Sequence, residues 1–192
     1  RAEKVSSFIS QAEAQMKASD FGAALRSIDS GLRMDAGNSD LVRLREKAQP
    51  MWEKLEKSRK SGLSSTEMLK EKGDDAYKKA QFEEAIQHYS ECLDDLTGKA
   101  TTYKASPLAI KCYLNRSACY KQISNFDGTI ADATAVLDVD PGNVKALMRR
   151  AQACEAIEKY RFALQDVRDV LAMPQDKVGQ ANFTLANGMQ HR

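Results

Sequence analysis

The sequence has few of the residue types that metal sites and catalytic centres use most. It contains two histidines, His88 and His191, and four cysteines that form no Cys-x-x-Cys pair, so the ligand spacing of a zinc site is missing. No nucleophile stands beside a base in a pattern typical of covalent or acid–base catalysis. We therefore expect no enzymatic activity, no metal and no cofactor in this chain.

An excess of one charge and long apolar runs are missing as well. The 29 Lys+Arg and 27 Asp+Glu residues leave a formal net charge of +2, which gives no broad positive field for nucleic acid. No apolar run approaches the about 20 residues that span a bilayer, and no leader precedes a cleavage site, so neither membrane nor secretion is indicated. With the cysteines interpreted as reduced, buried thiols, we expect a cytoplasmic protein.

The composition is that of a folded, charge-coated chain. Hydrophobic residues make up 42% and charged residues 29%, enough for a continuous core under a solvated surface. The chain begins at Arg1 and stops at Arg192 within a stretch of helical character. We therefore expect it to be a piece of a longer protein.

A short pattern recurs four times along the chain. It consists of an aromatic, a small residue three positions later and a leucine eleven positions later. Its members are Phe21/Ala24/Leu32, Phe82/Ala85/Leu93, Phe126/Thr129/Leu137 and Tyr160/Ala163/Leu171. The aromatics lie 61, 44 and 34 residues apart, which indicates a 34-residue unit with insertions in the first two steps.

Each unit carries the signals of two helices and a turn. Apolar residues follow helical spacing, as in Ala85, Ile86, Tyr89, Cys92 and Leu93, and no strand pattern is present. Asp140–Asn143 predicts a turn between helices, and Ser64 with Glu67 predicts a capping box. Small residues are expected where paired helices approach closely, at Gly73, Ala85, Ala151 and Ala163.

This pattern resembles the tetratricopeptide repeat (TPR) family, whose 34-residue helix pairs often end in proline, here Pro141. The resemblance is strong over residues 66–173 and weaker over 5–38, where Gly31 and Ala36 replace the usual alanine and proline. It implies an all-α fold, an α-α superhelix of tetratricopeptide helix-turn-helix repeats.

Four parts are expected along the chain. They are a divergent N-terminal repeat (1–38), a linking helix (39–63), a three-repeat domain (64–173) and a capping helix (174–192). Pro50 should kink or divide the linking helix, and the insertion at 96–107 should form a longer loop.

In such arrays the first helix of each pair lines a concave groove. The inward positions, six of them basic and three acidic, are Glu67, Lys70, Asp74, Tyr77, Lys78, Lys111, Leu114, Asn115, Ala118, Lys121, Lys145, Met148, Arg149, Gln152 and Glu155. Charge on an exposed helix face explains such a composition without any ligand, but it does not explain the arrangement of the residues.

The arrangement resembles that of co-chaperones that bind the C-terminal tails of cytosolic heat-shock chaperones, of the 70 or 90 kDa class, with a two-carboxylate clamp. The resemblance implies that Lys70 and Asn115 hold the terminal carboxylate of the tail. Lys145 and Arg149, at i,i+4 spacing, would engage an acidic side chain. Further groove contacts are expected from Tyr77, Lys78, Lys111, Lys121 and Gln152.

One clamp position departs from that subgroup, which has asparagine where this chain has Asp74. A carboxylate only accepts hydrogen bonds and repels the terminus of the ligand. Asp74 also lies four residues after Lys70, so the two are expected to pair and to compete with the ligand.

The sequence thus favours a non-enzymatic peptide-binding adaptor, with no nucleic-acid or membrane partner. Two alternatives stay open: a generic TPR scaffold that uses residues 5–60 or its groove for another ligand, and a regulatory module of a larger enzyme such as a prolyl isomerase or phosphatase. The sequence does not set the oligomeric state.

Overall fold

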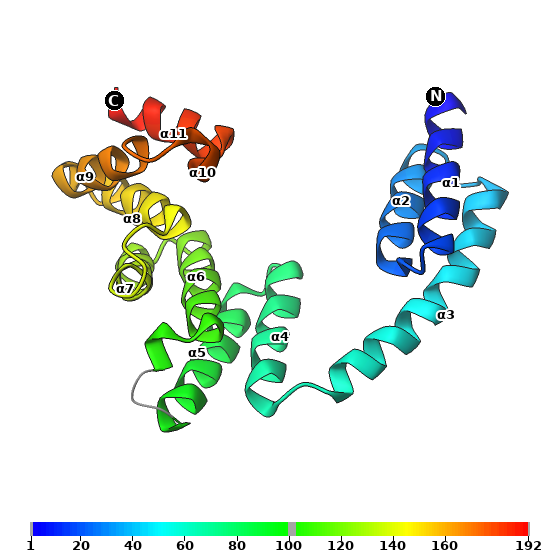
Figure 1. The fold of residues 1–192 in the computed structure, drawn as a ribbon, viewed down its shortest axis with the longest axis horizontal. Helices are drawn as coiled ribbons and strands as arrows, with labels where there is room; N and C mark the ends of the chain where they lie inside the picture. Colours follow the sequence, from blue (N-terminus) through cyan, green and yellow to red (C-terminus); the bar gives the residue numbers. More distant parts are fainter. Residues whose placement is uncertain (1, 100–102, 192) are drawn as a thin grey trace. The chain divides into compact units, whose positions relative to one another are not determined.

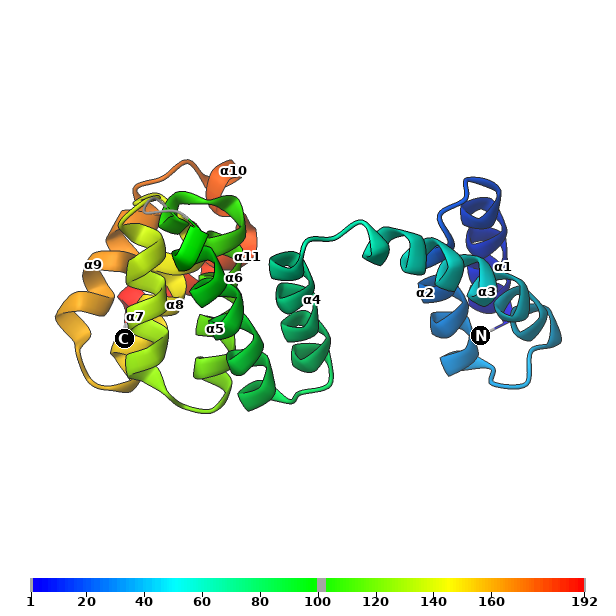
Figure 2. The ribbon, with the colours of Figure 1, turned by 90° about the horizontal axis from the view of Figure 1, so that it is seen from below.

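The computed structural model describes residues 2–99 and 103–191 of the chain. Within these residues every regular element is helical, which confirms the predicted all-α class (Figure 1; Figure 2). The helices form two compact units, residues 1–63 and 64–192. Among the described helices, none is long and apolar enough to cross a membrane.

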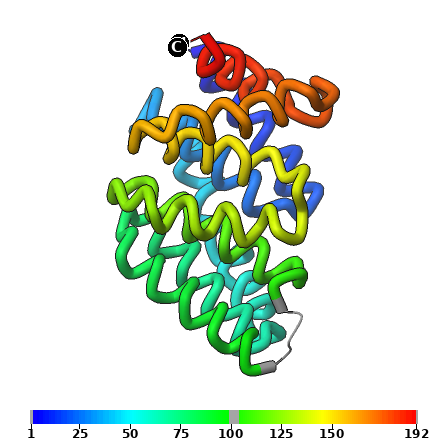
Figure 3. The backbone as a smooth tube through the Cα atoms, turned by 90° about the vertical axis from the view of Figure 1, so that its left-hand side faces the viewer, coloured from blue at the N-terminus to red at the C-terminus, as the bar shows by residue number. Residues whose placement is uncertain are grey.

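The first unit consists of α1 (Ala2–Lys17), α2 (Phe21–Met34) and α3 (Ser39–Ser61). The second contains α4 (Ser65–Lys78), α5 (Phe82–Lys99), a 3-10 turn η1 (Tyr103–Ala105), α6 (Pro107–Gln122), α7 (Phe126–Leu137), α8 (Val144–Ala156), α9 (Tyr160–Leu171), α10 (Gln175–Val178) and α11 (Gln180–Gln190). In the second unit α4 pairs with α5, α6 with α7 and α8 with α9, and each pair packs on the next (Figure 3).

The recurring aromatics mark the same place in all four pairs. Phe21, Phe82, Phe126 and Tyr160 are each the first residue of the second helix of a pair. Two positions earlier, Ser19, Ala80, Ser124 and Glu158 all adopt the left-handed conformation, with φ of 58° or 59°. The next backbone N–H donates to a carbonyl five residues back, which satisfies an end of the first helix. The repeat is therefore carried by one turn geometry used four times.

Close approach between neighbouring helices explains two of the glycines. A Cβ on Gly73 would lie 2.6 Å from the ring of Tyr89, so α4 can approach α5 only with glycine there. In the first unit, a Cβ on Gly31 would lie 2.6 Å from a methyl group of Leu41. This packing explains why glycine replaces the usual alanine in the divergent N-terminal repeat.

Two buried ion pairs tie the first and second helices of the later repeats together. Arg116 donates to Asp132 from two nitrogens, at 2.8 and 2.7 Å, and Arg150 does the same to Asp166, at 2.9 and 2.7 Å. The two pairs are 34 residues apart, so they occupy the same place in successive units. Burial raises the pKa of Asp132, although the hydrogen bond from Arg116 opposes that shift.

Two predicted helix starts are confirmed, and two other local predictions need a more detailed statement. The capping box of Ser64 and Glu67 is present, and Asn143 caps α8. Helix α3 continues without a break through Pro50, so that proline does not divide it. Within the predicted loop at 96–107, α5 runs to Lys99 and η1 precedes α6, while residues 100–102 lie outside the described part.

The C-terminal segment forms two helices where one was expected. Gly179 separates α10 from α11, with a φ of 78° that favours glycine. Helix α11 packs on α9 and buries Ala186 and Met189. These helices cover the outer side of the last repeat.

Candidate peptide-binding groove

The first helices of the three pairs in the second unit, α4, α6 and α8, share a pocket with α5. Its volume is about 250 Å³, and it is lined by Asp74, Tyr77, Lys78, Tyr89, Asn115, Ala118 and Arg149. Six of these seven residues were expected on the inner surface from their spacing alone. The seventh is Tyr89, which comes from the second helix of its pair.

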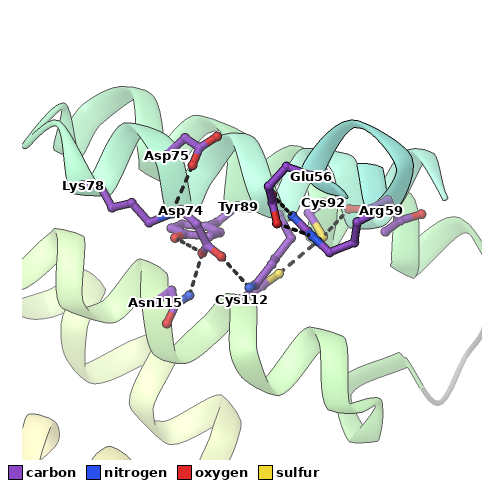
Figure 4. Close-up of polar contacts among 11 residues, drawn as sticks. Glu56, Arg59, Asp74, Asp75, Lys78, Tyr89, Cys92, Cys112 and Asn115 are labelled. Atoms are coloured by element: carbon purple, nitrogen blue, oxygen red, sulfur yellow. Dashed lines mark hydrogen bonds and ion pairs between the residues drawn. The ribbon is translucent and has the colours of Figure 1, made fainter. Parts of the chain in front are cut away.

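The Asp74 carboxylate is the centre of this pocket's hydrogen bonding (Figure 4). Its Oδ2 accepts from the ammonium of Lys70 at 2.5 Å, the i,i+4 pair that the sequence predicts. Its Oδ1 accepts from the hydroxyl of Tyr89 at 2.7 Å and from the side-chain amide of Asn115 at 3.0 Å. Three donors from three helices therefore converge on one carboxylate.

Tyr89 is the member of this cluster that sequence reasoning missed as a site residue. It is 1% exposed, and its pKa is raised, first by burial and then by the hydrogen bond to Asp74. The hydroxyl therefore keeps its proton and acts as a donor to Asp74. The available signal was a tyrosine on the apolar face of a helix, because a buried hydroxyl needs a polar partner.

Arg149 lines the same pocket as Asp74, but among the described residues no oppositely charged side chain accepts a hydrogen bond from it. Its guanidinium donates to the backbone carbonyl of Leu114 and, at 3.3 Å, to the hydroxyl of Ser117. No carboxylate of the described residues lies within ion-pair distance of it. Burial lowers the pKa of Arg149, because desolvation disfavours the charged form. It is a partly buried cation that has no carboxylate partner within the described part of the chain.

The remaining basic positions lie on the first helices of the pairs, α4, α6 and α8. Lys145 lies one turn before Arg149 on α8 and is exposed, as is Lys111 on α6. Lys78 pairs with Asp75 at 3.2 Å, and Lys121 donates to Gln152. Of the predicted groove contacts, the pocket itself is lined by Asp74, Tyr77, Lys78, Asn115 and Arg149, and not by Lys70, Lys111, Lys121, Lys145 or Gln152.

Other predicted inner positions behave differently. Met148 is 4% exposed and belongs to the hydrophobic core, so its expected place on the groove surface is wrong. Tyr77 is exposed at the pocket, and its ring packs edge-on against Phe82 at 5.6 Å between centroids. Glu67 uses its carboxylate to cap α4.

The geometry indicates which ligand chemistry this pocket suits. Among the residues that the structure describes, no group of three His, Cys, Asp or Glu side chains is placed to hold a metal ion. The pocket offers hydrogen-bond donors and an unbalanced guanidinium, which suit recognition of an anionic side chain. Its scaffold is an all-α superhelix of tetratricopeptide helix-turn-helix repeats.

Comparison with known proteins agrees with that scaffold. No family model matches the chain. It is 39% identical over 105 residues to sperm-associated antigen 1 of mouse, and 38% identical over 100 residues to protein unc-45 homolog B of Xenopus tropicalis. The aligned segments cover 54% and 52% of this chain but only 11% and 10% of those relatives. The chain thus spans about a tenth of the length of these curated relatives.

Similar solved structures are TPR domains. The Arabidopsis OM64 TPR domain is 29% identical with a TM-score of 0.52, and the match covers 67% of this chain and 96% of that one. The TPR2B domain of yeast Sti1 in its pHsp70 complex is 20% identical with a TM-score of 0.55, covering 66% and 93%. The first TPR domain of RPAP3 bound to the HSP90 peptide SRMEEVD is 23% identical with a TM-score of 0.53, covering 66% and 90%. The chain therefore has the TPR fold and resembles TPR domains of chaperone-associated proteins.

Proposed function

We propose that the second unit is a non-enzymatic adaptor whose groove binds the acidic C-terminal tail of a cytosolic heat-shock chaperone of the 70 or 90 kDa class. The observation that carries this proposal is Arg149, a partly buried guanidinium that has no carboxylate partner among the described residues and that lines a pocket of about 250 Å³. An unbalanced buried cation is costly, and an anionic ligand relieves that cost.

In the proposed complex Arg149 and Lys145 hold an acidic side chain of the tail. The two lie on one face of α8, where i,i+4 spacing lets both approach one carboxylate. Lys70 and Asn115, the side chains assigned to the second half of the clamp, lie beside Asp74 and donate to it. Secondary contacts would come from Tyr77, Lys78, Lys111, Lys121 and Gln152. The complexes that Sti1 and RPAP3 form with chaperone peptides support the choice of ligand.

The domain assignment follows from the same proposal. Residues 64–173 would be the binding domain, 174–192 its cap, 39–63 a linking helix and 1–38 a divergent repeat. We further propose a cytoplasmic protein, because that is where such a tail is displayed.

Isothermal titration of the whole chain with the peptide SRMEEVD tests the proposal. Arg149→Ala and Lys145→Ala should each weaken binding by about 10-fold or more, since a charge-assisted hydrogen bond contributes about 1.5–3 kcal/mol. Arg168→Ala, which removes an exposed charge from α9, is the matched control and should bind like the wild type. Equal affinity of all four proteins, with helix content intact by circular dichroism, would point to a TPR scaffold for another ligand.

A further inference from the structure

The Asp74 cluster fills the part of the groove that the clamp would reserve for the terminus of the ligand. Lys70 and Asn115, the two side chains assigned to a terminal carboxylate, both donate to Asp74. Tyr89 has a single hydroxyl proton, and it too is directed at Asp74. The protein's own carboxylate therefore stands where a carboxylate of the ligand was expected (Figure 4).

A second carboxylate would fit this cluster poorly. It would bring two anions to one lysine, and it would have to take donors away from Asp74, whose side chain is only 25% exposed. A carboxylate has about four acceptor positions, and Asp74 uses three. What remains is an acceptor, which suits an N–H donor of the ligand.

A peptide that continues past the groove, or that ends in an amide, supplies such an N–H, whereas a free terminal carboxylate does not. The other wall of the pocket still requires an anion, because Arg149 has no carboxylate partner among the described residues. The two walls of the pocket therefore suit different groups of the ligand: an acidic side chain at Arg149 and an amide N–H at Asp74.

We infer that this groove binds acidic segments through their side chains and does not require a free C-terminus, because Asp74 occupies the terminal-carboxylate subsite from within. This inference rests on the proposed function, and it widens the class of ligand. Internal acidic segments of a partner protein become ligands equivalent to acidic tails.

The test compares three forms of one peptide by isothermal titration of the whole chain. They are SRMEEVD with a free C-terminus, the same peptide as its C-terminal amide, and the same sequence extended by several glycine and serine residues. The wild type should bind all three with dissociation constants within about twofold of one another. Asp74→Asn should bind the free acid at least about fivefold more tightly than the amide, since Asn supplies a donor and removes a charge.

Asp127→Asn is the matched control, because it removes the same charge from an exposed side chain in the first turn of α7 that does not line the pocket. Its ratio of acid to amide affinity should equal that of the wild type. Thermal melting of each variant confirms that it is folded before its titration is interpreted.

Three results would contradict the inference. A wild type that prefers the free acid by fivefold or more overturns it while the proposed function stands, as does an unchanged ratio in Asp74→Asn. If no form of the peptide binds the wild type, the proposed function fails and the inference fails with it.

Discussion

Arg149 and Arg150 are neighbours in the sequence and opposites in the structure. Arg150 donates from two nitrogens to Asp166, which is 2% exposed, and so ties α8 to α9. Arg149 points to the other side of α8, into the pocket, where it meets only a carbonyl and a hydroxyl group. The carboxylate partner of an arginine therefore distinguishes a side chain held within the fold from one that is available to a ligand, which residue type and position alone do not.

Removal of Arg150 should destabilise the fold far more than removal of Arg149. Arg150→Ala leaves Asp166 buried without its partner, which should cost about 3–5 kcal/mol of unfolding free energy. Arg149→Ala should cost less than about 1 kcal/mol, because no buried anion loses its partner. Urea denaturation followed by circular dichroism measures both, and similar losses in the two variants would contradict the assignment of roles.

The close approach of α4 and α5 at Gly73 should affect stability by a smaller amount. Gly73→Ala places a methyl group against the ring of Tyr89, and such overpacking should cost about 1–3 kcal/mol. Gly188→Ala is the matched control on α11, where a Cβ would meet nothing within 4 Å, and it should stabilise the protein by about 0.5–1 kcal/mol. Thermal melting distinguishes the two, and a stabilised Gly73→Ala would show that α4 and α5 do not pack as described.

The smallest effect concerns the exposed cap of α4. Hydrogen bonds from the backbone N–H and the hydroxyl of Ser64 lower the pKa of Glu67. A carboxyl whose folded pKa is depressed adds stability above its unfolded pKa and loses it as the pH falls through the folded pKa. The gap in melting temperature between wild type and Glu67→Gln should therefore narrow between pH 7 and pH 3.

Glu83→Gln serves as the control for that titration, because Glu83 is an exposed glutamate in the first turn of α5. The difference in melting temperature between Glu83→Gln and the wild type should change less over the same pH range. If this difference in melting temperature changed equally in both variants, the capping box would not be the cause of the pH dependence.

Local patterns in the sequence predicted the fold because the repeat is itself local. The aromatics at 21, 82, 126 and 160 revealed the repeat, and the structure places each of them at the start of the second helix of a pair. The sequence did not reveal the left-handed residue two positions earlier, because serine, alanine and glutamate occupy it and none of them signals positive φ as glycine does. Met148 was misplaced because spacing alone does not distinguish a groove surface from the adjacent core.

The sequence likewise predicted the candidate site only where its contacts are local. The pair of Lys70 and Asp74 follows from i,i+4 spacing on one helix. The bonds from Tyr89 and Asn115 to Asp74 span 15 and 41 residues, and they depend on how closely α4, α5 and α6 pack. Gly73 sets that approach, so the pocket is a property of the packing as much as of the residues that line it.

The stacking order of the helices has a consequence for local unfolding. In the second unit each helix packs mainly on its neighbours in the chain, so opening of one terminal pair breaks one interface and leaves the others in place. Asp74 and Tyr89 lie in the first pair, α4 and α5, whereas Arg149 lies in α8. Transient release of that pair would dismantle the carboxylate cluster and leave the arginine in position, so the two walls of the pocket can differ in their amide hydrogen-exchange rates.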